Sequence, residues 1–153
     1  MVITGLPMPP SANALYRNVN RRFGKGSGRV KTNEYKIFES KIKQWAWQNP
    51  DQFTLARTFI KLVQSRGDLI RLDLTFFFER SRIITKDQRP KRLDTSNRLK
   101  AMHDALANML GFDDCLIWSG AFDKIALHTG GEYAEAKLAI IKKNHAFTPT
   151  PNV

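Results

Sequence analysis

The sequence has little cysteine and no long hydrophobic run. Its single cysteine, Cys115, excludes an internal disulfide and a cysteine-based zinc site, and favours a reducing cytoplasm. No apolar run approaches the ~20 residues that span a bilayer, and the N-terminus lacks the charged-then-apolar pattern of a signal peptide. We therefore expect a cytoplasmic protein without a membrane segment.

Acidic residues are also few. Only 14 Asp and Glu oppose 25 Lys and Arg, which leaves a net charge of +11 on 153 residues. This balance favours a polyanionic partner, nucleic acid before a membrane surface, although a merely basic or ribosome-associated protein is the alternative. The length suits one domain with one core. We expect residues 1–143 to form that domain and residues 144–153 to be a flexible, proline-bearing tail.

The positive charge is concentrated in two segments. Residues 17–31, RNVNRRFGKGSGRVK, contain no acid, and their glycines indicate a mobile loop rather than a regular element. Residues 80–92 form a second basic loop, opposed only by Asp87. We interpret both as arms that contact a phosphate backbone; the alternative is a solvated surface loop. The candidate DNA-binding residues in these segments are Arg17, Arg21, Arg22, Lys25, Arg89, Lys91 and Arg92.

The remaining pattern predicts an α+β fold in which a small sheet packs against helices. The clearest strand is 68–79, where Ile70, Leu72, Leu74, Phe76 and Phe78 alternate with other residues, so that one face is apolar. A helix is expected from residue 33, capped by Thr32 and ended by Pro50, whereas residues 51–64 suit either a helix or a loop. The other expected elements are strands at 1–6, 121–128 and 132–143, the last two joined as a hairpin at Gly130-Gly131.

Residues 92–117, RLDTSNRLKAMHDALANMLGFDDCLI, carry the candidate chemistry. Asp94 precedes a helix capped by Thr95 or Ser96, and the pair Asp113-Asp114 follows it at the start of an expected strand. Helical spacing gives a core stripe of Leu99, Met102, His103, Leu106, Met109 and Leu110. It gives a separate polar sector of Asn97, Lys100, Asp104 and Asn108, flanked by Ala101, Ala105 and Ala107, which should leave the backbone approachable.

Carboxylates at the two ends of one helix can meet in space if the chain returns tightly. Such a cluster beside a lysine suits metal-assisted phosphodiester cleavage, because Mg²⁺ (or Mn²⁺ in its place) prefers oxygen ligands and a lysine can offset phosphate charge. The alternative is purely structural: Asp94 stabilises the helix dipole, Lys100 and Asp104 form an i,i+4 ion pair, and Asp113-Asp114 is a turn. His103, on the apolar stripe, is interpreted as a core histidine.

These residues resemble the RusA-like Holliday-junction resolvases. D-x-S-N-x-x-K-x-x-x-D-A-L at 94–106, followed by D-D at 113–114, is similar to that family's D-x-D-N-x-x-K-x-x-x-D-A-L and later D-D. The opening LPMPPSANALYR at 6–17 resembles the family's proline-asparagine segment, and Lys124 matches a lysine after the D-D strand. The resemblance implies a small mixed sheet and a homodimeric, Mg²⁺-dependent endonuclease that nicks four-way DNA junctions in recombination and repair.

The resemblance also implies roles for individual residues. Asp94 and Asp114 would bind metal and act in catalysis, Asp113 would be an alternate ligand, and Lys100 would be the essential lysine. Asn97 would support the acid loop. The family's second aspartate is Ser96 here, and a neutral hydroxyl is a poor replacement for a carboxylate ligand.

The serine leaves three outcomes open. Asp104, Asp113 or Asp123 supplies the missing oxygen; the site works with more water; or the protein binds junction DNA without cutting it. A further alternative is an RNA-binding accessory protein.

Overall fold

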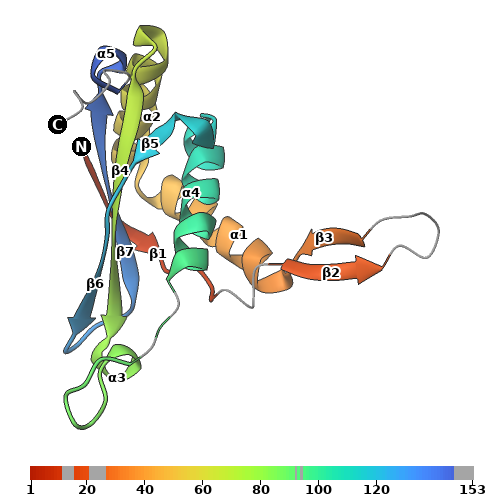
Figure 1. Cartoon of the computed structure of the whole chain (residues 1–153), viewed down its shortest axis with the longest axis vertical. Helices are drawn as coiled ribbons and strands as arrows, with labels where there is room; N and C mark the ends of the chain where they lie inside the picture. The colour runs from red at the N-terminus through yellow and green to blue at the C-terminus, as the bar shows by residue number, and fades with distance from the viewer. Residues whose placement is uncertain (12–15, 21–26, 92, 94, 147–153) are drawn as a thin grey trace, which may run out of the picture.

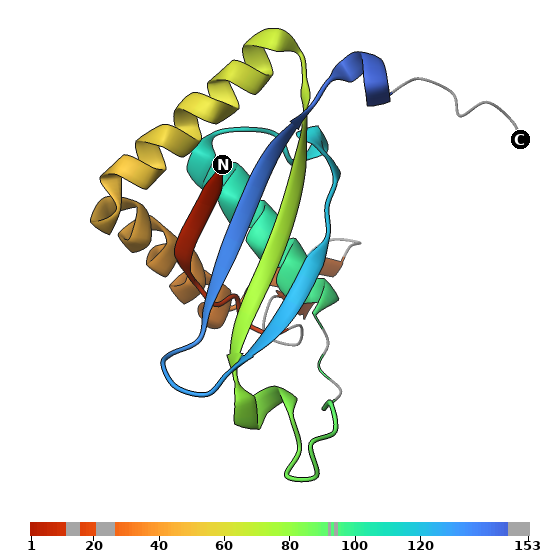
Figure 2. The same ribbon diagram turned by 90° about the vertical axis from the view of Figure 1, so that its left-hand side faces the viewer.

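The computed structural model describes residues 1–11, 16–20, 27–91, 93 and 95–146, with the backbone alone for 16–20, 27–29, 96, 97, 145 and 146. Over these residues the fold is α+β, as predicted. One mixed sheet is covered by helices on a single face, and no element of the described part of the chain packs against its other face (Figures 1 and 2). Among the described helices, none is long and apolar enough to cross a membrane.

The main sheet is built around strand β4 (Leu69–Glu79). On one side β4 pairs antiparallel with β7 (Tyr133–Ile141), which in turn pairs antiparallel with β1 (Val2–Pro7). On the other side it pairs in parallel with β5 (Ile117–Ser119) and β6 (Phe122–Leu127). The expected strands at 1–6, 68–79, 121–128 and 132–143 are all present, within a residue or two at their ends.

The apolar face of β4 is the centre of the core. Its alternate residues Ile70, Leu72, Leu74, Phe76 and Phe78 are all buried. They face the helices because successive side chains of a strand point to opposite sides of the sheet. The predicted apolar face is therefore confirmed, and it fixes which side of the sheet the helices cover.

Two helices follow one another directly. Thr32 caps α1 (Asn33–Gln48), and its Oγ1 accepts a hydrogen bond from the Tyr35 backbone N–H at 3.2 Å. Pro50 both ends this helix and opens α2 (Pro50–Arg66), because a missing N–H costs nothing in a first turn. The undecided segment 51–64 is thus helical. The Trp45 indole of α1 donates to the Thr4 carbonyl at 3.1 Å and ties the helix to β1.

The prediction of a hairpin at Gly130-Gly131 is wrong. Strands β6 and β7 both pair with β4, which lies between them, so the turn carries the chain past the end of β4. The long apolar strand has backbone groups to satisfy on both edges, and the two later strands supply them. A local pairing of β6 with β7 would have left β4 with an open edge.

The described parts of the two basic segments include regular elements that were not expected of loops. Strands β2 (Tyr16–Asn20) and β3 (Ser27–Lys31) pair as an antiparallel ribbon that extends away from the body in Figure 1. In the second segment, α3 (Arg80–Ile83) is followed by a turn closed by a bridge between Ile84 and Pro90. Paired backbone groups give both segments a defined direction, which the glycines and charges did not predict. In the expected tail, residues up to 146 belong to α5 (Lys143–Ala146), and 147–153 lie outside the described residues.

Candidate functional site

Helix α4 (Ser96–Leu110) carries the residues predicted to form the site. Met102, Leu106 and Leu110 of the predicted core stripe are buried. Leu99, Met109 and His103 are half-buried, and desolvation lowers the pKa of His103, so that histidine borders the core. Thr95 is the N-cap residue, but no side-chain bond closes the cap.

The alanines of α4 do not lie where they were expected. Ala101, Ala105 and Ala107 are buried rather than open to the solvent. The helix packs against α1 and α2 as well as against the sheet, so it buries a wider sector than one apolar stripe. Small side chains there let neighbouring elements approach closely, and the exposed side of α4 is correspondingly narrow.

The chain turns back sharply after α4. Gly111 adopts a φ of 78°, a left-handed conformation that favours glycine, and Phe112 is buried behind the turn. The expected strand from Asp113 begins instead with a short 3₁₀ helix, η2 (Asp114–Leu116), before β5. This return brings Asp113 and Asp114 alongside the C-terminal half of α4.

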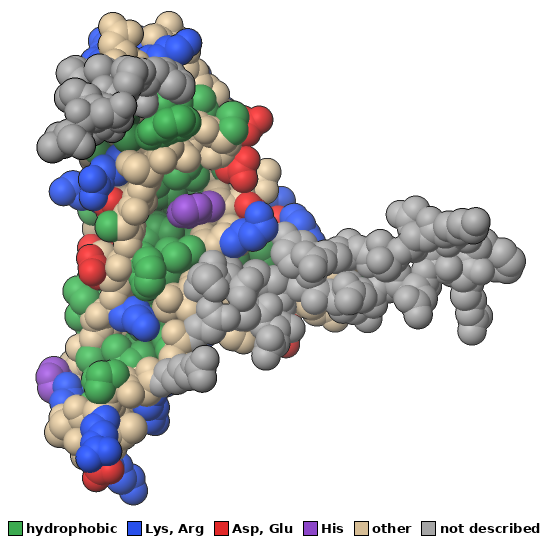
Figure 3. Space-filling view, viewed as in Figure 1, with side chains coloured by type: hydrophobic (Ala, Val, Ile, Leu, Met, Phe, Trp, Pro, Cys, Tyr) green, Lys and Arg blue, Asp and Glu red, His purple; other side chains and the backbone are tan. Residues whose placement is uncertain are grey.

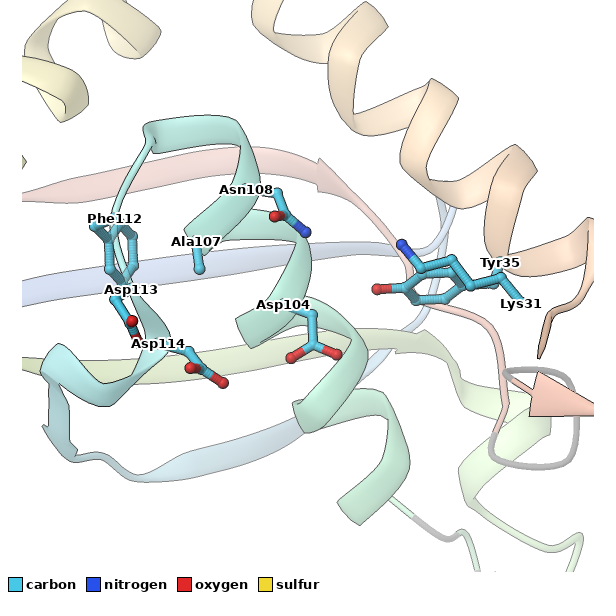
Figure 4. Close-up of a pocket in the computed structure, with 8 residues that line it drawn as sticks. All are labelled: Lys31, Tyr35, Asp104, Ala107, Asn108, Phe112, Asp113 and Asp114. Atoms are coloured by element: carbon cyan, nitrogen blue, oxygen red, sulfur yellow. The ribbon is translucent and has the colours of Figure 1, made fainter. Parts of the chain in front are cut away.

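Three carboxylates from these elements line one pocket. Asp104 of α4 and Asp113 and Asp114 of the return border a depression of about 320 Å³, together with Asn108 and, from the α1 side, Lys31 and Tyr35. Figure 4 shows the Asp104 and Asp114 side chains on the same side of α4. An acid of the helix and the acids of the return therefore border the same depression, and the helical acid is Asp104. Asp94 lies outside the described residues.

Lys100 lies one turn from Asp104. Its Nζ is 3.8 Å from the Asp104 Oδ1, which is the i,i+4 pair of the structural alternative. Both groups are partly in water, where such pairs contribute only about 0.3–0.5 kcal/mol, so the lysine is easily drawn to another anion. The pair thus does not preclude a role for Lys100 at a phosphate.

The two neighbouring aspartates differ in their surroundings. The Asp113 carboxylate caps η2 by accepting a hydrogen bond from the Cys115 N–H at 2.9 Å, and this bond holds the pKa of Asp113 below its usual range. The same carboxylate raises the pKa of the exposed Cys115 thiol, which disfavours the reactive thiolate. Asp113 is thus committed to the turn, as in the structural alternative, and Asp114 is the better placed to take a ligand.

Among the described residues, no group of three or more His, Cys, Asp or Glu side chains is close enough to hold a metal ion. The donor chemistry of Asp104 and Asp114 nevertheless fits a hard cation such as Mg²⁺, which keeps several waters and needs few protein oxygens. Asp123, one of the acids considered as a replacement for the serine at 96, pairs with Thr75 on the face of the sheet opposite α4. Of the three acids considered, Asp104 and Asp113 share a pocket with Asp114, whereas Asp123 lies on the opposite face of the sheet.

Three of the predicted DNA-binding residues belong to elements on the two sides of the first turn of α4. In Figure 1 this turn lies between the β2–β3 ribbon, which carries Arg17, and the α3 turn, which carries Arg89 and Lys91. The Lys91 Nζ donates to the Ser81 carbonyl at 2.6 Å, so this lysine also holds the turn together. Lys124 is exposed on β6 and pairs with Phe76, which places it on the helix-covered face. Four of the candidates lie outside the described residues: Arg21, Arg22, Lys25 and Arg92.

Sequence reasoning missed Arg98. This arginine is buried, donates a hydrogen bond to the Pro9 carbonyl, and lies 5.5 Å from the centre of the Phe78 ring. It therefore anchors the proline-rich opening segment to the first turn of α4. The available signal was its helical spacing to Met102 and Ala105, which puts an arginine on a buried face.

No protein-family model matches the chain, and no curated protein matches it significantly.

Proposed function

We propose that this protein is a Mg²⁺-dependent, structure-selective DNA endonuclease that resolves four-way junctions, acting in the cytoplasm as a homodimer. The observation that carries the proposal is the convergence of Asp104 and Asp114 beside Lys100 in a chain with a net charge of +11. The positive charge of the protein favours DNA, and carboxylates close to one another can bind a metal ion that also contacts a DNA phosphate. The similarity of residues 94–114 to the RusA-like motif supports the same reaction.

In this proposal each residue has a stated task. Asp114 and Asp94 bind the metal, with Asp113 as an alternate ligand, and Asp104 replaces the oxygen that Ser96 does not provide. Bound Mg²⁺ (or Mn²⁺) would lower the pKa of a water and offset phosphate charge. Lys100 leaves its weak pair with Asp104 to neutralise a non-bridging phosphate oxygen. Asn97 supports the acid-bearing segment.

The basic elements on the two sides of α4 would hold the junction arms by their backbones. Such contacts read the shape of DNA rather than its sequence. A two-fold symmetric substrate with two strands to nick matches a symmetric dimer.

The test is cleavage of a synthetic four-way junction with Mg²⁺ or Mn²⁺. Wild type should cut, and Asp94→Asn and Asp114→Asn should not, while both variants still bind the junction. Absence of cutting by the wild type, in either metal, would contradict the proposal.

A second candidate function is junction binding without cleavage, which the serine at position 96 favours. Ser96→Asp distinguishes the two. Binding by the wild type with cutting gained only in Ser96→Asp would establish the binding protein. Preference for structured RNA over the junction in competition would indicate an RNA-binding accessory protein instead.

A further inference from the structure

A second depression opens on the other side of Asp114, between α4 and the β5–β6 edge of the sheet. Its volume is about 290 Å³, and we call it the aromatic groove. Leu99 and His103 of α4 form one wall, Trp118 and Phe122 belong to the other, and Asp114 also lines the groove. Because Asp114 lines both depressions, the groove begins beside the proposed metal ligand.

The groove exposes two large aromatic side chains. Trp118 is 51% exposed and Phe122 is 43% exposed. Phe122 pairs with the buried Leu74, which places it on the helix-covered face beside the groove. Trp118 lies at an irregularity in the pairing of β5 with β4, and such irregularities redirect a side chain. Adjacent exposed aromatics are unfavourable in water and are typical of a binding surface.

Two lysines lie next to residues that line the groove. Lys124 follows Phe122 on the same face of β6 and is exposed. Lys100 of α4 is exposed and close enough to His103 to influence its charge. Figure 3 shows hydrophobic side chains reaching the surface on this face, with Lys and Arg side chains around them. A groove lined by aromatic rings, with lysines nearby, complements a nucleotide, whose base is flat and whose phosphates are anionic.

We propose that the aromatic groove holds an unpaired nucleobase next to the phosphate that is bound at Asp114. This inference rests on the proposed nuclease function and names the feature of the substrate that the site selects. Bases in an intact duplex are stacked on one another and cannot enter the groove, whereas bases at a branch point or in a single strand can. Stacking on an aromatic ring accepts any base, so selection depends on unpairing rather than on sequence.

The experiment measures binding with Ca²⁺ in place of Mg²⁺, so that affinity is separated from cleavage. The probes are a four-way junction, a duplex of the same arm sequence and an oligothymidylate strand. Trp118→Ala should weaken binding of the junction and the single strand about 10- to 100-fold and leave the duplex within about 2-fold. Trp118→Phe should restore most of the affinity. Trp47→Ala removes a tryptophan that is 82% exposed on α1 and should change nothing.

A second measurement uses the unaltered protein. Thymines at the branch point are replaced by 5-iodouracil, which on ultraviolet irradiation crosslinks to an aromatic ring on which it stacks, and the adduct is mapped by mass spectrometry. Adducts on Trp118 or Phe122 support the inference, and adducts only elsewhere overturn it.

The other possible results of the binding experiment also test the inference. Equal losses on all three DNAs, or none, would overturn the groove as a base site. Loss on the single strand alone would overturn the branch-point assignment. If the wild type cuts junctions in Mg²⁺ while Trp118→Ala binds normally, the groove inference alone fails; if the wild type never cuts, the proposed nuclease function fails whatever Trp118 does.

Discussion

At the scale of single residues, Asp113 and Asp114 show how neighbouring carboxylates acquire different tasks. The Asp113 carboxylate accepts the Cys115 N–H and shapes the turn, whereas Asp114 borders both the depression that Asp104 lines and the aromatic groove. The turn therefore serves to position the second acid. The structural interpretation of this pair therefore applies to Asp113, and the functional interpretation applies to Asp114.

The difference between the two acids predicts different effects of the same substitution. Asp114→Asn removes an ionised oxygen proposed to bind metal and should lower the cleavage rate on the order of 100-fold or more, with the melting temperature unchanged. Asp113→Asn is the matched comparison and should lose much less activity, because Asp113 is only an alternate ligand and an asparagine oxygen can still accept the Cys115 N–H. Single-turnover cleavage and thermal melts measure both. Equal losses in the two variants would contradict the assignment of Asp114.

A third aspartate, Asp68, is predicted to affect stability rather than activity. It is buried, and the Lys142 Nζ donates to its Oδ2 at 2.9 Å; this bond holds the pKa of Asp68 below its ordinary value. A carboxylate with a lowered pKa in the folded state stabilises the fold at pH values above about 4, and the contribution is lost as the pH falls below that. Asp68→Asn should therefore flatten the decline of unfolding free energy below about pH 4.

Chemical unfolding at several pH values tests this prediction. Lys142→Met should remove the same part of the pH dependence, because it removes the partner of Asp68. Curves for wild type and Asp68→Asn that run parallel below pH ~4 would show that the ion pair does not contribute.

At the scale of elements, the connection between β5 and β6 depends on Gly120. A Cβ added there would overlap the carbonyl oxygen of Leu72 in the adjacent β4, and backbone cannot move aside as a side chain can. Gly120→Ala should therefore destabilise the fold by about 1–3 kcal/mol. Gly131→Ala is the control, because no described residue other than its chain neighbours has an atom within 4 Å of the added Cβ. Equal melting temperatures for the two variants would mean that the β5–β6 connection shifts without cost.

The elements that the sequence predicted well are those with a strong local pattern. The alternation of β4, the Thr32 cap of α1 and the periodicity of α4 each specify an element from neighbouring residues alone. The prediction that residues 121–128 and 132–143 pair as a hairpin failed, because both strands pair with β4 instead. Strand partners are set by non-local contacts, which a glycine turn does not encode. The expectation that Ala101, Ala105 and Ala107 leave the backbone approachable failed for the same reason: they are buried, and small residues do not reveal which elements pack on them.

The candidate site was predicted in part. The return of Asp113 and Asp114 towards the polar side of α4 followed from a helix, a glycine and a short turn. The meeting of Asp114 with Asp104, and the aromatic groove behind it, required the position of the sheet edge. Helical spacing alone could not supply that position.

At the scale of the whole molecule, the charge is expected to act through the α3 turn. Arg89→Gln should make the negative slope of log affinity against log salt concentration shallower by about 0.9, the value for one lost phosphate contact. Lys61→Gln makes the same charge change on α2, on the far part of the fold in Figure 1, and should leave the slope unchanged. Junction binding at a series of salt concentrations measures both. An unchanged slope in Arg89→Gln would exclude this turn from the DNA contact.

The most direct measurement is the single-turnover rate at which the purified protein cuts a four-way junction in Mg²⁺, compared with a linear duplex of the same arms. We predict paired nicks in the junction, little cutting of the duplex, and loss of both in EDTA. Intact junctions in the presence of bound protein and saturating Mg²⁺ would contradict the proposal that this is a junction-resolving endonuclease.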